Sequence, residues 1–533
     1  MNKDALNDLV KTFFTCNKEE LSEIFEEMLS VVELEQKSGL NTTMSRNYSS
    51  AQANPEINAN PGNLKDARDA IFPFFWGTDG WNNPLHLENV KGPANYASLI
   101  GAVACLLKNP NLCTDTYSQR SNELEVKSIT ALANLLFYHT ESPWGVFTMG
   151  GTISNLYGGK IGLERVCPGA MQEGLQGATV CGITSQAAHY SNSTLAGWLG
   201  IGTQNLHAVP TDHNMSMRMD LLEEKMDELY QAGEKLAFVI ATFGSTDAFG
   251  IDDISKIREL IDHKSKKYGV PPAQLHVDAA VGWFMTLLNE YDLEINEFSL
   301  CKGTLDRVQS IQTAAKGLRC ADSVTIDFHK MGWGHYPGSA FIVNRREDLN
   351  FLFRKKSEVP YFAEADVNRD PALFTLECSR PAIGPYSVMA TLNGLGLRGC
   401  QMLAVNTIDM SRKLKERLNG ISNVKVLNPE CIGPQVLWWV LPKGRDAGDI
   451  YDKILSGELS EENAKPYFEE IRRMYDHREE SLNQTDDPRL SFTTSIGFCP
   501  HEIQLPAWKA SFFNPATDDT IIDKIVASIE ELL

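Results

Sequence analysis

A lysine that follows an apolar strand is the first residue in the sequence whose position suggests chemistry. Lys330 lies near the centre of SVTIDFHKMGWGHYPGSAFIV, residues 323 to 343. The β-branched residues from Ser323 to Phe328 predict a buried strand, and the glycines and proline after Lys330 predict a turn before a second strand, Ala340 to Val343. Partial burial would lower the pKa of the lysine, so that its amine could attack a carbonyl carbon and form a Schiff base. An ordinary lysine with its amine in solvent is the alternative.

Two glycines and a threonine could bind an anion. In MGGTISNLYG, Gly150, Gly151 and Thr152 come immediately before a predicted helix. Backbone N–H groups at the start of a helix bind anions, and glycine lets a phosphate approach the backbone closely. A plain turn is the alternative, because Gly-Gly pairs are common in turns.

Three more polar residues follow predicted strands of the same region. His189 follows the strand ATVCGIT and could face a ligand ring, or it could be a hydrogen-bonded structural histidine. Asp278 in AQLHVDAAVGWF could pair with a protonated ring nitrogen, and Thr246 follows the strand LAFVIAT; either could instead cap a helix or a turn. The carboxyl ends of parallel strands meet at one edge of a sheet, so we expect these residues to share a site with Lys330. Together they suit pyridoxal phosphate.

The elements that must position these residues predict an α/β fold. Between residues 144 and 343, short apolar strands alternate with helical patterns, which indicates a mainly parallel sheet covered by helices on both faces. Before this region, the pattern predicts helices from Ala94 to Leu107 and from Ser121 to Tyr138. In the second helix, Asn122 could be the N-cap, with Glu125 completing a capping box.

The two ends of the chain differ from this middle region. The first forty residues have the apolar spacing of two amphipathic helices, which could form an arm that packs on another lobe or subunit. Residues 41 to 65 are rich in Asn, Ser, Pro and Ala and predict a loop. A long helix from about Tyr386 to Asn419 leads to a smaller α/β lobe. We therefore expect a helical arm with a loop segment, a large domain and a small C-terminal domain, over residues 1–95, 96–395 and 396–533.

The composition narrows the possible partners to small molecules. Lysine and arginine number 49 against 69 acidic residues, and the net charge of -20 argues against nucleic acid. No apolar run approaches the ~20 residues that span a bilayer, and the first residues lack the layout of a secretory signal, so we expect a cytoplasmic protein without membrane contact. The 11 cysteines are irregularly spaced, with no Cys/His set at zinc spacing, which predicts reduced thiols and no metal site.

The order of the motifs resembles that of the group II pyridoxal-phosphate amino-acid decarboxylases, which include glutamate, aromatic amino-acid and bacterial tyrosine decarboxylases. The similarity runs over roughly residues 90 to 400, through GGTISNLYG, TSQAAHYS, FGSTDAFGIDD, HVDAA and DFHKMG. It implies the aspartate-aminotransferase fold, fold type I, with a large domain built on a mainly parallel sheet of seven strands. It also implies pyridoxal 5'-phosphate as cofactor and a homodimer with active sites at the subunit interface.

The resemblance further implies a role for each motif. Lys330 would hold the cofactor as a Schiff base, His189 would stack on its ring, and Asp278 would pair with the ring nitrogen. Ala280 would pack under the ring, and Thr246 would lie near the ring hydroxyl.

The resemblance also assigns the two ends of the cofactor site. Gly150, Gly151, Thr152 and His329 would line the phosphate end. In this family, a tyrosine on a loop after the lysine protonates the substrate carbon. Tyr361 is the matching residue, and the nearby Tyr336 is an alternative.

Two further residues bear on the substrate. DFHKMGWGHYPGSAFIV is more similar to bacterial tyrosine decarboxylases than to the animal enzymes, and His86 falls near a pocket histidine of that subgroup, although it could equally be a surface-loop residue. Lys509 stands where glutamate decarboxylases usually carry an arginine, and lysine cannot offer the same bidentate grip on a carboxylate. The expected reaction is α-decarboxylation of an L-amino acid, with a tyrosine-like substrate favoured over glutamate or aspartate. A carbon–carbon lyase and a catalytically silent scaffold stay open as alternatives.

Overall fold

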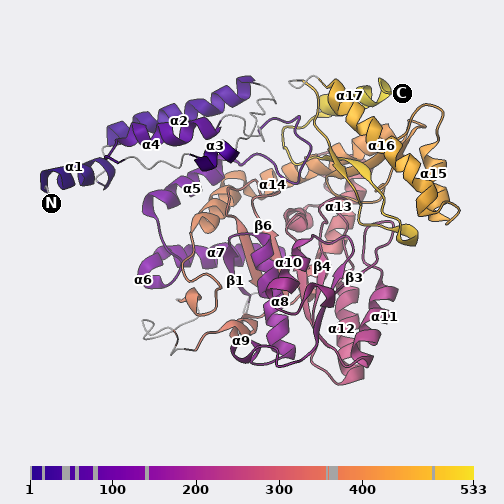
Figure 1. Cartoon of the computed structure of the whole chain (residues 1–533), viewed down its shortest axis with the longest axis horizontal. Coiled ribbons are helices and arrows are strands. Elements are labelled where there is room, and N and C mark those ends of the chain that lie inside the picture. Colours follow the sequence, from indigo (N-terminus) through magenta and orange to yellow (C-terminus); the bar gives the residue numbers. More distant parts are fainter. Residues whose placement is uncertain are drawn as a thin grey trace.

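The computed structural model describes residues 3–14, 18–38, 48–53, 59–75, 82–138, 143–355, 358, 370–482 and 486–533. Its largest element is a seven-stranded sheet with the order β1-β7-β6-β5-β4-β2-β3. The strands are β1 (Trp144–Thr148), β2 (Val180–Ser185), β3 (Leu206–Val209), β4 (Lys235–Thr242), β5 (Gln274–Asp278), β6 (Ser323–Asp327) and β7 (Ser339–Val343). Only β7 runs antiparallel to its neighbours within this sheet, so the predicted α/β class with a mainly parallel sheet is confirmed (Figure 1).

Helices cover both faces of this sheet because the side chains of β4 alternate between two apolar clusters. Phe238 and Ile240 pack with α8 and α10, whereas Val239 and Ala241 point to the opposite face, where they share a cluster with α7, α11 and α12. The helices are α7 (Arg120–Leu135), α8 (Gly151–Val166), α9 (Ala170–Glu173), α10 (Ser191–Trp198), α11 (Met219–Gln231), α12 (Ile254–Tyr268) and α13 (Lys302–Ala315). The strands are therefore buried on both sides, which explains their continuous apolar sequences.

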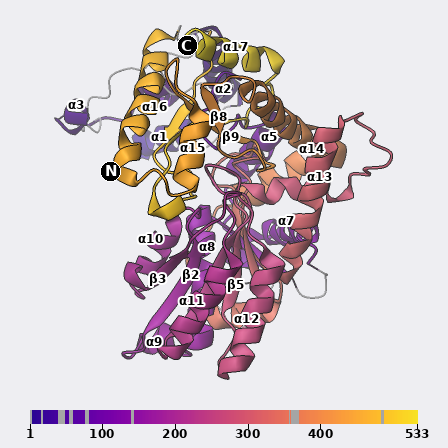
Figure 2. The ribbon, with the colours of Figure 1, turned by 90° about the vertical axis from the view of Figure 1, so that its right-hand side faces the viewer.

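A smaller antiparallel sheet with its own core forms the C-terminal part of the chain. Its strand order is β10-β11-β9-β8, and Trp438, Trp439 and Trp508 are fully buried in it. Its elements are β8 (Val424–Val426), β9 (Gln435–Val440), α15 (Ala447–Leu455), α16 (Glu461–Ser481), β10 (Ser491–Thr493), β11 (Ala507–Ser511) and α17 (Asp519–Glu530). Figure 2 shows this lobe, in orange and yellow, above the large sheet.

The long helix α14 (Ile383–Leu418) joins the two lobes and is broken once. Gly396 has φ 65° and ψ 170°, values that divide the element into two helices. The left-handed φ favours glycine at this position. The predicted domain limit at residue 395 falls beside this break, although the domain limits themselves stay a prediction.

Helices at the N-terminal end form an arm at the side of the large domain (Figure 1). They are α1 (Lys3–Phe14), α2 (Lys18–Ser38), α3 (Tyr48–Ala53) and α4 (Leu64–Ile71), and α5 (Tyr96–Lys108) and α6 (Asp115–Ser118) follow on the body. The prediction of a loop over residues 41 to 65 was wrong in part, because α3 lies within it and α4 begins there. Asn63 and Asp66 form the capping box that starts α4, a signal that the loop-like composition masked.

The predicted capping box of α7 was wrong as well. The helix begins at Arg120, so Asn122 lies inside it. The Glu125 carboxylate instead accepts a hydrogen bond from the backbone N–H of Phe147 (2.8 Å) and pairs with the buried Arg380 guanidinium (2.6 Å). Glu125 thus joins α7 to β1 and to the segment before α14, because a buried carboxylate needs a charged partner.

In the part of the chain that the structure describes, no helix combines the length and apolarity that crossing a membrane requires. The ten cysteines in that part all carry free thiols, as the sequence predicts. Four of them are buried: Cys105, Cys181, Cys400 and Cys431.

Candidate active site

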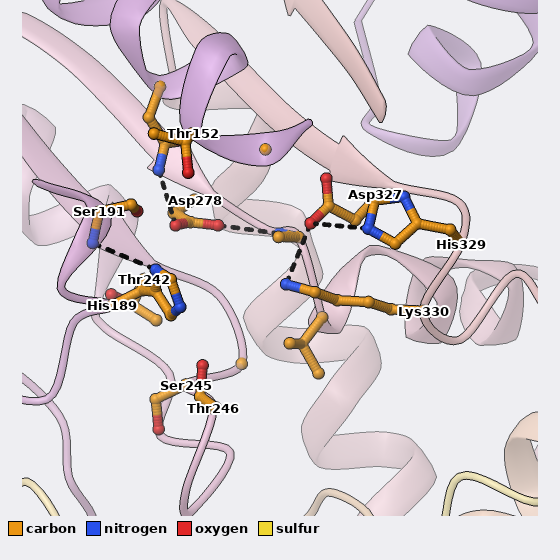
Figure 3. Close-up of a pocket in the computed structure, with 15 residues that line it drawn as sticks. Thr152, His189, Ser191, Thr242, Ser245, Thr246, Asp278, Asp327, His329 and Lys330 are labelled. Carbon is orange, nitrogen blue, oxygen red and sulfur yellow. Dashed lines mark hydrogen bonds and ion pairs between the residues drawn. The ribbon is translucent and has the colours of Figure 1, made fainter. Parts of the chain in front are cut away.

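The carboxyl ends of four strands and the start of one helix surround a cavity of about 230 Å³ (Figure 3). The strands are β2, β4, β5 and β6, and the helix is α8. The lining residues are Gly151, Thr152, Asn155, His189, Ser191, Thr242, Gly244, Ser245, Thr246, Asp278, Ala280, Val281, Asp327, His329 and Lys330. Polar side chains that are far apart in sequence thus meet at one edge of the sheet, as expected for parallel strands.

Lys330 lies in this cavity beside a buried carboxylate. Its Nζ is 3.0 Å from Oδ2 of Asp327, the last residue of β6, and the other Asp327 oxygen accepts a hydrogen bond from Ser339 Oγ (2.6 Å). Burial alone would lower the pKa of Lys330, but the carboxylates of Asp327 and Asp278 outweigh it, and the pKa is raised. The expectation of a lowered pKa was therefore wrong for the protein without cofactor, because the sequence did not reveal that Asp327 would pair with this amine.

Asp278, at the end of β5, is held in a fixed orientation. Its Oδ2 accepts a hydrogen bond from Asn155 Nδ2 (2.9 Å), and its Oδ1 accepts one from the backbone N–H of Ala280 (3.1 Å). In Figure 3 the side chain lies above His189, with Lys330 to the right of both. Both carboxylate oxygens thus have a donor on the protein side, and the group is rigidly placed to act on a ligand.

Behind Asp278, a buried network fixes the orientation of Asn155. Its Oδ1 accepts a hydrogen bond from Thr325 Oγ1 (2.7 Å) and lies 3.0 Å from Nε2 of His276. His276 Nδ1 lies 2.8 Å from Ser323 Oγ. Complete burial lowers the pKa of His276 to about 3, so this ring stays neutral and places no positive charge behind Asp278.

His189 follows β2 and faces the same cavity. Its Nδ1 accepts a hydrogen bond from the backbone N–H of Ser191 (3.2 Å). Burial lowers the pKa of His189, although Asp278 opposes the shift. A neutral imidazole with one nitrogen already engaged can present its face to a flat ligand.

The start of α8 packs unusually close to β6. A Cβ atom on Gly151 would lie 2.8 Å from both carboxylate oxygens of Asp327, so a larger residue would force that carboxylate to shift. The backbone N–H groups of Gly151 and Thr152 are among those that a helix start leaves without an intrahelical partner. Beside them, the ring of His329 packs against that of Tyr336, with the centroids 3.8 Å apart and the planes tilted by 31°.

These residues fit a phosphorylated pyridine cofactor. His329 Nδ1 and Thr242 Oγ1 are buried and have no hydrogen-bond partner among the described residues. Buried polar atoms are rarely left without a partner, so both atoms are available to a ligand. Together with Lys330, Asp278 and the N–H groups at the start of α8, they provide an amine, a ring-nitrogen partner and an anion site.

The structure brings together most of the predicted site residues. Eight line the cavity: Lys330, His329, Asp278, Ala280, His189, Thr246, Gly151 and Thr152. Gly150 does not line it, although it is the N-cap of α8. Tyr361 lies outside the described residues, so its role stays a prediction.

The two predicted substrate residues lie away from the cavity wall. His86 is buried beside the small domain, where its backbone pairs with Arg489, so it is not a surface-loop residue. Lys509 of β11 is also buried, and its Nζ lies 2.7 Å from Oδ1 of Asp247, the neighbour of Thr246. Their location depends on how the small domain packs, which motif order cannot show.

Sequence reasoning missed Asn155, Thr242 and Asp327. A signal exists for two of them. Asn155 lies four residues after Gly151, on the same face of α8, and Asp327 is the last residue of the strand that leads to Lys330. For Thr242, the sequence offered no signal, because a threonine at the end of a strand is not distinctive.

Comparisons with known proteins identify the family of the chain. The model of the pyridoxal-dependent decarboxylase conserved domain matches residues 48–440. An L-2,4-diaminobutyrate decarboxylase of Acinetobacter baumannii is 27% identical over 68% of this chain and 68% of its own length. The acidic amino acid decarboxylase GADL1 of Bos taurus is 25% identical over 68% and 64%, and an L-tyrosine decarboxylase of Enterococcus faecalis is 29% identical over 45% and 40%.

A solved structure has the same fold. The crystal structure of mouse CSAD in its apo form superposes with a TM-score of 0.76 at 18% identity, over 96% of this chain and 99% of that chain. The fold is therefore that of the fold type I enzymes. On the family match, the chain belongs to the pyridoxal-dependent decarboxylases, the amino-acid carboxy-lyases that use pyridoxal 5'-phosphate.

Proposed function

We propose that this protein removes the α-carboxylate of an L-amino acid as carbon dioxide and releases the corresponding amine. The observation that carries the proposal is the convergence of Lys330, Asp278 and His189 on one cavity at the carboxyl edge of the sheet. Pyridoxal 5'-phosphate, when bound, supplies the electron sink for the electron pair that the departing carboxylate leaves on the α-carbon.

The residues of the chain bind and orient the two reactants. Lys330 would hold the cofactor through its amine, and Asp327 at 3.0 Å stabilises a proton on that nitrogen whenever the amine is free. Asp278, fixed by Asn155, would keep a proton on the ring nitrogen, and His189 would pack on the ring. The N–H groups at the start of α8 and His329 would bind the phosphate.

For the proton that replaces the carboxylate, we propose Tyr361 as the donor, with Tyr336 as the alternative. Tyr336 packs on His329. Burial is the main cause that raises the pKa of its phenol, and the nearby Asp327 carboxylate is the second. A phenol with a raised pKa stays protonated at neutral pH and can serve as an acid.

We further propose that the substrate has an aromatic side chain like that of tyrosine. The resemblance of the Lys330 segment to tyrosine decarboxylases supports this choice. The pairing of Lys509 with Asp247 supports it too, because a lysine already neutralised by a carboxylate is a poor receptor for a second substrate carboxylate. The competing substrates are glutamate, aspartate and a diamino acid.

A panel of amino acids tests both parts of the proposal. We expect carbon dioxide release only in the presence of pyridoxal phosphate, with tyrosine or another aromatic amino acid giving the highest kcat/KM. Preference for glutamate or aspartate would contradict the aromatic substrate. Bound cofactor without carbon dioxide from any amino acid would favour a carbon–carbon lyase, and failure to bind cofactor would favour a silent scaffold.

We also propose a homodimer to which the N-terminal arm contributes. No residue of α1 is buried, and Leu6, Val10 and Phe14 are exposed on it. Such an apolar surface is typical of a helix that packs on a partner. Deleting residues 1 to 60 is expected to raise the dimer dissociation constant about tenfold or more, measured by analytical ultracentrifugation. An unchanged constant would exclude this role for the arm.

A further inference from the structure

Three side chains of types that can ligate a metal meet at the amino end of the large sheet, opposite the candidate active site. Cys181 is the second residue of β2, His207 is the second of β3, and Glu234 immediately precedes β4. Their ligand atoms, one thiol, one imidazole nitrogen and one carboxylate oxygen, all lie within 4.8 Å of one another. The three strands are parallel neighbours, so their first residues share one edge.

The strand register places the three side chains on one face. His207 pairs with Ile183, two residues after Cys181 on β2, and Cys181 pairs with Leu236, two residues after Glu234. Residues two apart on a strand point to the same side of a sheet. The three side chains therefore meet because of the register in which their strands pair. Their spacing in the sequence alone predicts no metal site.

Several buried polar atoms in and beside the cluster lack a hydrogen-bond partner in the described part of the chain. His207 Nε2 and Glu234 Oε2 are buried and have no hydrogen-bond partner in the ranges that the structure describes. The same holds for the hydroxyl of Tyr230 on α11. Leaving a buried carboxylate oxygen without a donor or cation is costly.

The Cys181 side chain is fully buried between its neighbours. The Cys181 thiol has one proton to donate. If Glu234 accepts it, His207 Nε2 still has no partner. A divalent cation satisfies all three groups at once, because it displaces the thiol proton and its charge is balanced by one thiolate and one carboxylate.

We propose that Cys181, His207 and Glu234 bind one zinc ion, with water in the fourth position. Thiolate and imidazole ligands favour zinc over magnesium or calcium, which prefer oxygen. Tetrahedral zinc with bonds of about 2.0–2.3 Å separates its ligand atoms by about 3.3–3.7 Å, so the cluster closes by roughly 1 Å. The ion joins the edge strand β3 to β2 and β4, at the end of these strands opposite the cavity that holds Lys330.

Zinc binding to the full-length holoenzyme tests the site directly. After dialysis against a chelator, zinc chloride is added, excess ion is removed, and bound metal is measured by mass spectrometry. We expect close to one zinc per chain, a higher unfolding temperature, and at least about a tenfold loss of affinity in Cys181→Ala and His207→Gln. Cys400→Ala, which removes a buried thiol from α14, should bind zinc as the parent does.

Two further measurements separate the possible failures. The Lys330→Ala variant should still bind one zinc, since the site does not depend on the cofactor or on decarboxylation. Cobalt in place of zinc should give a thiolate charge-transfer band that Cys181→Ser lacks, which identifies the ligand even if the alanine variant folds poorly. The proposal would be overturned if the parent bound much less than one zinc per chain. It would also be overturned if His207→Gln and Cys181→Ser left the zinc affinity unchanged.

Discussion

Lys330→Ala is expected to lose turnover by at least about three orders of magnitude and to lose the visible absorbance of lysine-bound cofactor. The amine of Lys330 is the only lysine nitrogen on the cavity wall formed by the described residues. Its removal also leaves the buried Asp327 carboxylate without its cation 3.0 Å away. The measurements are carbon dioxide release and an absorbance spectrum after addition of pyridoxal phosphate.

A matched control separates the loss of this amine from the loss of any lysine. Lys302 at the start of α13 is exposed, and its Nζ lies 2.6 Å from Oδ2 of Asp306 on the same helix. Lys302→Ala should therefore keep both turnover and spectrum. Borohydride reduction of the parent should also fix the cofactor to the peptide that contains Lys330. Retained turnover and spectrum in Lys330→Ala would contradict the assignment of this residue.

Asp278→Asn should keep part of the bound cofactor but reduce kcat about a hundredfold to a thousandfold, similar to the removal of one preorganised electrostatic contact. A neutral amide cannot hold a proton on the ring nitrogen. The new amide also interferes with its partner, because Asn155 Nδ2 donates to Asp278 Oδ2 and would face a second donor in one amide orientation. Steady-state kinetics at saturating cofactor measure the effect.

The control for this variant is another buried carboxylate outside the cavity. Asp348 is buried and pairs with Arg165 and Arg345. Asp348→Asn should lower the unfolding temperature while leaving kcat near that of the parent. If Asp278→Asn had near-normal turnover, the proposed electronic role of Asp278 would be wrong, whatever its effect on stability.

The sequence predicts those site residues whose position is determined by the end of a strand. Lys330, Asp278 and His189 each follow a strand of one parallel sheet, so their meeting follows from the topology. The raised pKa of Lys330 could not be predicted, because it depends on the distance between its amine and Asp327. The partner of Lys509 was equally hidden, since Asp247 lies 262 positions earlier and meets it only when the small sheet packs on the large domain.

The helix boundaries also show which features local sequence signals predict and which depend on long-range contacts. The composition of residues 41 to 65 predicts a loop, yet Asn63 and Asp66 start α4 through local hydrogen bonds. For α7, the capping pattern at Asn122 and Glu125 was present in the sequence, but the buried Arg380 attracts the Glu125 carboxylate. Long-range charge pairing overrode a local signal, which single-sequence patterns cannot anticipate.

The ion pair between Lys509 and Asp247 has a consequence for the whole molecule. The same loop is also held by Gln435 of β9, whose Nε2 donates to the backbone carbonyl of Thr246 (3.2 Å). Strands β9 and β11 of the small sheet thus both contact the loop that carries Thr246, which lines the cavity of the large domain. The two lobes are therefore coupled. A substitution in the core of the C-terminal lobe can move the Asp247 carboxylate, whose charge acts on His189, without changing a residue of the cavity.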